Sequence, residues 1–261
     1  GGNPITTTSI YNLIHFLERK WGVHYAMGGT GALINGLKKL MIEEKITIKK
    51  NSEVTKIITE KNKVIGVEVN QNTKLFADKI IINADPTYTY KHLLETPFNK
   101  KWNKKRVDKL DYSMGLFVIF FGTKKIYKKI AHHTIWMGKR YEGLLNDIFK
   151  KKILADDFSL YLHRPTATDK SMAPKGCDCF YVLSPVPNLK GNLDWEKNGD
   201  KYRDKILLAL EKTIMPELKK NLEVCFYMTP ENFKNDYLST YGSGFSISPI
   251  FKQSAWFRFH N

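Results

Sequence analysis

The chain has 261 residues, of which 42% are hydrophobic, 13% aromatic and 26% charged, a composition typical of a globular protein of one or two domains. This composition excludes disordered and collagen-like proteins, and three cysteines are too few for a disulfide scaffold. No apolar run is long enough to span a membrane. The net charge of +16 comes mostly from lysine spread along the chain. This favours a solvated surface first, an anionic membrane surface second and nucleic acid last, because readers of base sequence depend on arginine.

The first ninety residues alternate between helical and strand patterns. Apolar residues at helical spacing predict a helix over 10–21, and the glycine turn at Gly28, Gly29 and Gly31 opens a second predicted helix over 32–44. Alternation of apolar and polar residues, or a short apolar run, then predicts strands. These predicted strands are 46–49, 54–59, 64–69 and 76–82.

Strands dominate the sequence from residue 114 onward. One long amphipathic helix is predicted over 200–220. Several strands without regularly alternating helices indicate a mixed or antiparallel sheet. The predicted strands are 114–121, 134–137, 158–163, 180–186 and 224–228.

These patterns divide the chain into an α/β unit over 25–86, an α+β unit over 87–235 and a loop-rich return over 236–261. In the first unit a glycine turn, a helix, a strand and a β-meander lead to Asn83-Ala84-Asp85. That order is expected where a chain re-enters a dinucleotide-binding sheet after an excursion.

Polar residues with possible chemistry occur at two places in the α+β unit. His132 and His133 are adjacent, and neighbours on a strand point to opposite faces, so we expect no metal site there. His163 and Arg164 end a predicted strand. They form either a salt-bridged strand end or a polar cap at a substrate cavity.

Several segments taken together resemble bacterial-type phytoene desaturases. The segments are Gly1-Gly2-Asn3-Pro4, Thr7-Thr8-Ser9-Ile10-Tyr11, Trp21-Gly22-Val23, Gly28-Gly29-Thr30-Gly31-Ala32-Leu33, 156–166, 181–187 and 253–258. The likeness runs end to end, and the joint pattern is specific although each segment is short. Phe259 departs from it, since the family usually has proline there. The family's N-terminal G-x-G-x-x-G motif and C-terminal glycine-rich segment are absent, so the resemblance implies an internal fragment that is inactive by itself.

The resemblance implies a flavoenzyme that desaturates phytoene by transferring a hydride from an acyclic C40 carotenoid to FAD. The implied fold is a partial FAD-binding Rossmann-like domain with an inserted substrate domain, built on a mixed or antiparallel sheet and helices. Residues 1–24 would be a helical part of the substrate domain, and 236–261 would return towards the FAD-binding domain. The backbone at Val54 would pass the adenine end of FAD, and Asn83, Ala84 and Asp85 would end the strand that returns from it.

Aromatic side chains suit a polyene substrate, because they pack on hydrocarbon and attract the positive charge that develops when hydride leaves. We expect such lining from five aromatic residues, although core packing explains them equally well. They are Phe158, Tyr161, Phe245, Trp256 and Phe257. His163 or Arg164 could accept the proton or orient a quinone that takes the electrons.

A C40 hydrocarbon is insoluble in water, so the resemblance implies peripheral attachment to the cytoplasmic side of a bacterial membrane. The segment 100–106 mixes lysine and arginine with Trp102, as either a docking patch or a solvated charged segment would. Four alternatives stay open at this point. They are a carotenoid isomerase, a diapophytoene desaturase, a basic nucleic-acid-binding protein and a remnant without activity.

Overall fold

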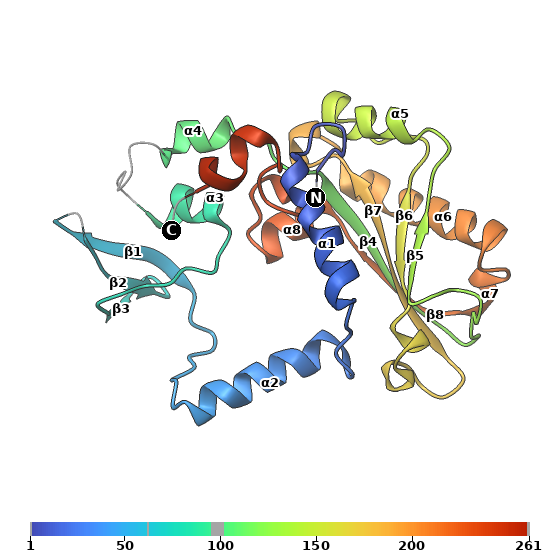
Figure 1. Cartoon of the computed structure of the whole chain (residues 1–261), viewed down its shortest axis with the longest axis horizontal. Helices are drawn as coiled ribbons and strands as arrows, with labels where there is room; N and C mark the ends of the chain where they lie inside the picture. Colours follow the sequence, from blue (N-terminus) through green and yellow to red (C-terminus); the bar gives the residue numbers. More distant parts are fainter. Residues whose placement is uncertain (1, 62, 95–101, 260–261) are drawn as a thin grey trace.

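The computed structural model describes residues 2–61, 63–94 and 102–259 of the chain (Figure 1). The helices are α1 (Asn12–Trp21), α2 (Gly29–Glu43), α3 (Pro86–Tyr88), α4 (Lys104–Asp108), α5 (Tyr141–Asn146), α6 (Trp195–Thr213), α7 (Leu218–Asn221) and α8 (Pro230–Asp236). The strands are β1 (Val54–Glu60), β2 (Lys63–Val69), β3 (Thr73–Phe76), β4 (Gly115–Thr123), β5 (His133–Trp136), β6 (Leu160–His163), β7 (Asp178–Val186) and β8 (Leu222–Met228). Short 3-10 and π-helical turns join some of them.

Five strands form one antiparallel sheet in the order β5-β6-β7-β4-β8. Aromatic and β-branched residues fill β4 and β7, which are the residue types that fit a pleated, half-buried surface. Each strand lies within two residues of its predicted bounds at either end. The antiparallel arrangement predicted for the second half of the chain is therefore confirmed.

The core lies between this sheet and α6, which runs along one face of it (Figure 1). Alternate strand residues point towards α6, so Phe117 of β4 and Leu162 of β6 pack with Ile206 and are fully buried. The helix begins five residues before the predicted start, because the Asp194 side chain accepts a hydrogen bond from the Lys197 amide and caps it. It also ends earlier than predicted, at Thr213, so the predicted single helix over 200–220 is wrong at its C-terminal end.

The strands β1, β2 and β3 form a separate antiparallel sheet in sequence order. The predicted strands at 54–59 and 64–69 are confirmed. The predicted strand at 46–49 is wrong, and the one predicted at 76–82 is wrong beyond Phe76. Neither segment forms a ladder of paired strands within the described ranges, and a strand needs a partner for its backbone hydrogen bonds. The Ala77 amide donates to the Ile65 carbonyl of β2 at 3.0 Å, and the pairing goes no further.

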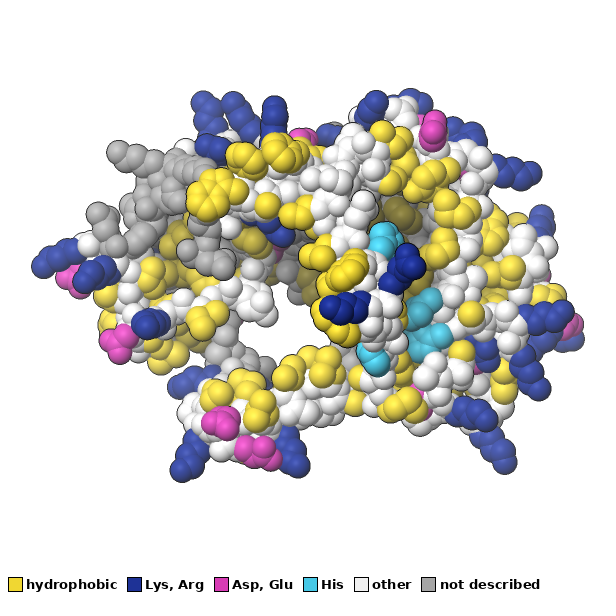
Figure 2. Space-filling view, in the orientation of Figure 1, with side chains coloured by type: hydrophobic (Ala, Val, Ile, Leu, Met, Phe, Trp, Pro, Cys, Tyr) yellow, Lys and Arg dark blue, Asp and Glu magenta, His cyan; other side chains and the backbone are white. Residues whose placement is uncertain are grey.

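The two N-terminal helices are confirmed, but their apolar residues are exposed. On α2 these include Leu33, Leu37 and Leu40. The turn before α2 has positive φ angles of 84° at Gly28 and 76° at Gly29, a conformation that glycine adopts without strain. Figure 2 shows an open hollow between α2, α1 and the β1–β3 sheet, so apolar side chains of this region lie next to open space.

The tail after α8 packs against the start of β4. The Gly244 amide donates to the Met114 carbonyl at 2.8 Å, and the Gln253 side chain donates to the Asp111 carbonyl, also at 2.8 Å. Thr7 forms an isolated antiparallel bridge with Ile250, which places the segment before α1 beside the tail that follows α8. The predicted domain boundaries stay predictions, because these contacts do not test them.

Two further findings concern membranes. None of the helices within the described ranges is both long and apolar enough to cross a bilayer. In the segment proposed as a docking patch, Lys100 and Lys101 lie outside the described residues, whereas Trp102 is only 3% exposed. Arg106 lies over its ring at 5.1 Å. Trp102 therefore cannot act as an interfacial anchor in this conformation.

Candidate functional site

The sheet face that α6 does not cover carries aromatic side chains across its strands. Successive residues of a strand point to opposite faces, so the residues between the core positions gather on this second face. We refer to it as the aromatic face. Its members are His133 of β5, Tyr161 and His163 of β6, Tyr181 of β7, Phe120 of β4 and Phe226 of β8.

These rings contact one another in sequence across the sheet. Phe120 stacks on Phe226 with ring centroids 5.1 Å apart and lies 6.0 Å from Tyr181. Tyr181 meets Tyr161 edge to face at 5.6 Å and His163 at 4.8 Å. Such pairs add to the packing energy that buried area alone gives. The result is a nearly continuous aromatic surface from one edge of the sheet to the other.

A cavity of about 470 Å³ lies over the aromatic face, a volume typical of small-molecule sites. Its wall opposite the sheet comes from Tyr25, the start of α2 and Met172. A Cβ on Gly29 would meet Met172 Cε at 3.0 Å, so glycine lets α2 begin close to this wall. The Gly28 amide donates to the Asp169 carboxylate at 2.6 Å, which ties the glycine turn to the loop after β6.

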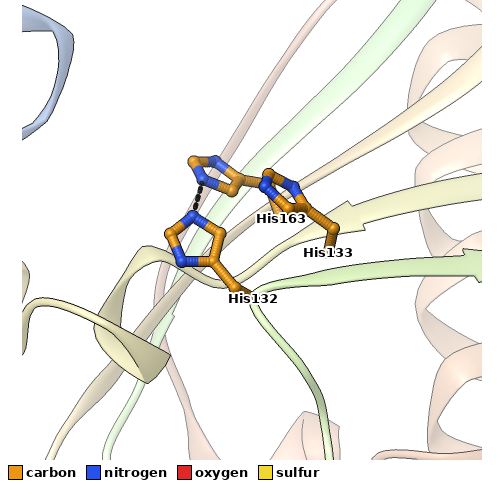
Figure 3. Close-up of side chains that lie close together, drawn as sticks. All are labelled: His132, His133 and His163. Carbon is orange, nitrogen blue, oxygen red and sulfur yellow. Dashed lines mark hydrogen bonds between the residues drawn. The ribbon is translucent and has the colours of Figure 1, made fainter. Parts of the chain in front are cut away.

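Three histidines meet at the edge of this cavity (Figure 3). His132 and His163 are joined by a hydrogen bond between their Nε2 atoms at 2.8 Å, and the His133 ring lies parallel to the His163 ring at 5.4 Å. The expectation that His132 and His133 point to opposite faces is wrong. Their ring centroids are 4.5 Å apart, because His132 precedes β5 and the alternation of a strand does not extend to it.

Burial shifts the pKa of three side chains at this site towards their neutral forms. Burial, with the neighbouring His132 and His133, lowers the pKa of His163 to about 4. Burial also lowers the pKa of His132 and raises the pKa of Tyr161. All three groups are therefore uncharged near pH 7, which keeps the aromatic face compatible with an apolar ligand.

Arg164 does not reach this site, although it follows His163 directly. Its guanidinium is buried, with Nε donating to both Asp178 carboxylate oxygens at 3.0 and 3.1 Å and Nη1 donating to the Ile130 carbonyl at 2.8 Å. The two interpretations of the pair thus apply to different residues. Arg164 forms the salt-bridged strand end, and His163 faces the cavity.

The five aromatic residues predicted to line the substrate site lie in three places. Tyr161 is on the aromatic face. Phe158 is buried on the α6 side, where it contacts Trp136 and Tyr202, so it does not line the cavity. Three residues are exposed outside the cavity. They are Phe245, Trp256 and Phe257.

The residues that do line the sheet side of the cavity were missed by the sequence interpretation. Phe120, Tyr181 and Phe226 all lie within strands that were predicted correctly. Reading each strand as two faces would have separated them from the core residues at the alternate positions. Clustering of aromatic residues in the sequence is a weaker guide to the cavity lining than strand alternation, because it does not separate the two faces of a strand.

The residues expected near the adenine end of FAD lie around the smaller sheet. Val54 starts β1, the edge strand of the sheet, and Asn83 and Ala84 are exposed. The Asp85 carboxylate accepts a hydrogen bond from the Tyr88 amide at 2.9 Å and caps α3. The π-helical turn Thr89–Leu93 that follows contacts β1, so these residues belong to one neighbourhood.

Comparison with known proteins gives a family and two kinds of relative. Residues 1–156 match the model of the flavin containing amine oxidoreductase family. A lycopene-forming phytoene desaturase from Pseudescherichia vulneris is 46% identical over 264 residues, covering 100% of this chain and 53% of the relative. A 4,4'-diapolycopene-forming 4,4'-diapophytoene desaturase from Methylomonas sp is 30% identical, again over 100% of this chain and 51% of the relative.

A solved structure shares the fold. An oxidoreductase from Methanosarcina mazei superposes with a TM-score of 0.60 at 18% sequence identity, over 84% of this chain and 47% of that one. The chain spans about half the length of the curated relatives it matches.

Proposed function

The chain belongs to the flavin-containing amine oxidoreductase family, and on that premise we propose that it serves in the FAD-dependent desaturation of phytoene in carotenoid biosynthesis. The observation that carries this proposal is the aromatic face beneath an apolar cavity. A hydrocarbon has no hydrogen-bonding groups, so only dispersion and ring contacts can hold it. The neutral, ring-lined surface of the five-stranded sheet offers these contacts.

The relatives favour a C40 substrate over the shorter alternative. The lycopene-forming phytoene desaturase is 46% identical to this chain, whereas the diapophytoene desaturase is 30% identical. Both are desaturases by name, which supports desaturation rather than isomerisation. A family match over the first 156 residues also makes a nucleic-acid-binding protein the weaker alternative.

The residues that would hold FAD are suited to contact its adenine end. β1 is an edge strand, and no strand pairs with its outer edge within the described ranges, so backbone N–H and C=O groups near Val54 are accessible there. Asn83 and Ala84 are exposed, and the turn Thr89–Leu93 that follows them in the chain contacts the same sheet. The Asp85 carboxylate accepts hydrogen bonds from Tyr88 and Thr87 and fixes the start of α3, and its expected place beside FAD stays a prediction.

The chemistry that FAD supplies when bound is acceptance of a hydride at the flavin ring. The aromatic face contributes the remaining requirements. It orients an extended polyene along the sheet, and the bound hydrocarbon displaces water from the rings that it covers. The π-faces of Phe120, Tyr181 and Phe226 attract the developing positive charge, by about 0.5–2 kcal/mol each. His163 is the imidazole of this face that lines the cavity, and its lowered pKa of about 4 keeps it neutral near pH 7.

We also propose peripheral attachment to a membrane, because the hydrocarbon dissolves only there. The net charge of +16 supports attraction to anionic lipid. Co-sedimentation with vesicles tests this point. Binding to vesicles that contain anionic lipid, and weaker binding to neutral ones, is expected, whereas equal absence of binding to both would contradict it.

The proposed reaction is tested with a chimera in which this chain replaces the matched segment of the lycopene-forming relative. The chimera is produced in a host that accumulates phytoene, and the carotenoids are analysed by mass spectrometry. Products lighter by two hydrogens per step are expected. Products of unchanged mass but altered geometry would show an isomerase. Unchanged phytoene with a flavin-loaded, folded chimera would contradict the proposal.

A further inference from the structure

We propose that His132, His133 and His163 form a binding site for a divalent transition-metal ion of the zinc class, at the edge of the cavity. Each residue offers one ligand atom, and the three atoms lie within 4.8 Å of one another (Figure 3). Neutral imidazole is a favoured ligand of such ions. The site shares His163 with the cavity of the aromatic face, but the proposed desaturation itself requires no metal ion.

Two of the rings are oriented by hydroxyl groups from outside the cluster. His132 Nδ1 lies 2.5 Å from Thr168 Oγ1, and His133 Nδ1 lies 2.7 Å from the Tyr161 hydroxyl. When Nδ1–H donates to an oxygen, the lone pair is left on Nε2. Metal-binding histidines generally have such a partner for the nitrogen that does not bind the metal. The arrangement therefore favours Nε2 as the ligand atom.

The spacing of the nitrogens requires only side-chain rotation to receive an ion. Zinc–nitrogen bonds of about 2.0–2.1 Å in tetrahedral geometry place two ligand nitrogens about 3.3 Å apart. The Nε2 atoms of His132 and His163 are 2.8 Å apart and must separate by about 0.5 Å to reach that spacing. His133 is exposed and has to turn inward while its Nδ1 stays in contact with the Tyr161 hydroxyl, and solvent can supply a fourth ligand.

The surroundings keep the imidazoles available to the ion rather than to protons. Tyr25 meets His132 edge to face at 4.7 Å, and Tyr181 meets His163 at 4.8 Å. Burial among such rings lowers the pKa of both histidines, so neither is protonated near pH 7. Without the ion, one proton is shared between the two Nε2 atoms. On binding, that proton leaves His163 Nε2 and moves to His163 Nδ1, because His132 Nδ1 already donates to Thr168. His163 Nδ1 is buried without a hydrogen-bond partner within the described ranges, so binding of the ion must offset the cost of this tautomer change.

The test is a metal titration of the chain, purified without a histidine tag and freed of metal with a chelator. Co²⁺ serves as the optical probe and Zn²⁺ as the competitor, because zinc binds such ligands more tightly than cobalt. We expect one Co²⁺ per chain, with the visible absorption of a low-coordinate site, and full displacement by one equivalent of Zn²⁺. A folded wild-type chain that shows no saturable binding would overturn the proposal.

Variants assign the binding to these residues. His132→Gln and His163→Gln should each weaken binding by roughly 10-fold or more, and Tyr161→Phe, which removes the partner of His133, by about 10-fold. The matched control is His15→Gln, because His15 is an exposed histidine on α1 outside the cluster. Circular dichroism checks that each variant is folded. Equal affinity in the control and in both cluster variants would place the ion elsewhere and overturn the proposal.

Discussion

Two regions of the molecule were predicted from regular spacing of apolar residues. In the five-stranded sheet with α6 these residues are buried, whereas on the helices α1 and α2 they are exposed. Leu162 of β6 is 0% exposed, whereas Leu33 of α2, also in a regularly spaced apolar set, is 55% exposed. The sheet finds its cover within the chain, because α6 follows β7 and packs on it. The apolar side of α2 finds no comparable cover within the described residues.

The difference teaches that periodicity identifies an element, whereas the partner that buries it depends on the rest of the sequence. The curated relatives are about twice as long as the matched chain. We therefore expect the apolar side of α2 to be covered in a protein of the relatives' full length. The predictions below compare the covered region with the uncovered one, in order of decreasing effect.

The largest change in the free energy of unfolding is expected from a substitution in the core beneath α6. Phe117 is fully buried and stacks on Trp195 at 5.5 Å and on Tyr227 at 5.0 Å. Phe117→Ala should lower the free energy of unfolding by about 3–5 kcal/mol, because it leaves a cavity in a packed core. Urea denaturation measures this. A loss of less than about 1 kcal/mol would mean that this layer is not the main core.

The next effect concerns the buried ion pair at the end of β6. Asp178 accepts hydrogen bonds from Arg164, from the Thr166 hydroxyl and from the Tyr127 amide. Asp178→Asn should cost about 3 kcal/mol of unfolding free energy, since it leaves the Arg164 charge buried without its counter-ion. The control is Asp156→Asn, at an exposed carboxylate, which should change stability little. Equal losses in the two variants would contradict the assignment.

A smaller effect is expected from pH. The pKa of His163 is about 4 in the folded chain and 6.5 for an unperturbed histidine, mainly because of burial. Between these values the unfolded chain binds more protons than the folded one, so stability falls as the pH falls from 6.5 to 4 and this contribution levels off below that. His163→Gln should flatten the slope of unfolding free energy against pH between these two values. An unchanged slope in this variant would show that His163 is not held neutral.

The smallest effect is expected on α2. Leu37 lies on its exposed apolar side, so Leu37→Ala should change the unfolding free energy of this chain by less than about 0.5 kcal/mol. The same substitution in the chimera with the lycopene-forming relative should cost more, if the added chain covers α2. Equal and negligible effects in both proteins would remove the idea that this side of the helix is covered.

Much of the fold could be predicted from local pattern. The strands of the larger sheet, both N-terminal helices and the antiparallel arrangement follow from alternation and helical spacing. The segments 46–49 and 77–82 could not be assigned correctly in this way, because extended residues become a strand only when another strand lies beside them. The N-terminal extension of α6 depended on one side chain, Asp194, whose capping role was overlooked.

The site was harder to predict than the fold. His163 and Arg164 were selected together as possible catalytic residues, a role that stays a prediction. His163 lines the cavity, whereas the Arg164 guanidinium points to the opposite side of the sheet. Phe158 was placed in the site because aromatics cluster near it, while strand alternation puts it in the core. The meeting of His132 with His163 joins residues 31 positions apart, which no local pattern contains.

The most direct test of the aromatic face compares two phenylalanines of similar exposure. Phe226 is 56% exposed and lines the cavity, whereas Phe245 is 52% exposed and lies outside it. Each is changed to serine in the chimera, flavin content is used to confirm folding, and the rate of phytoene loss is measured. We expect Phe226→Ser to slow phytoene loss by about 10-fold or more, which corresponds to roughly 1.4 kcal/mol of transition-state stabilisation, and Phe245→Ser to leave it unchanged. The reverse result, with Phe245→Ser impaired and Phe226→Ser fully active, would contradict the placement of the hydrocarbon on the aromatic face.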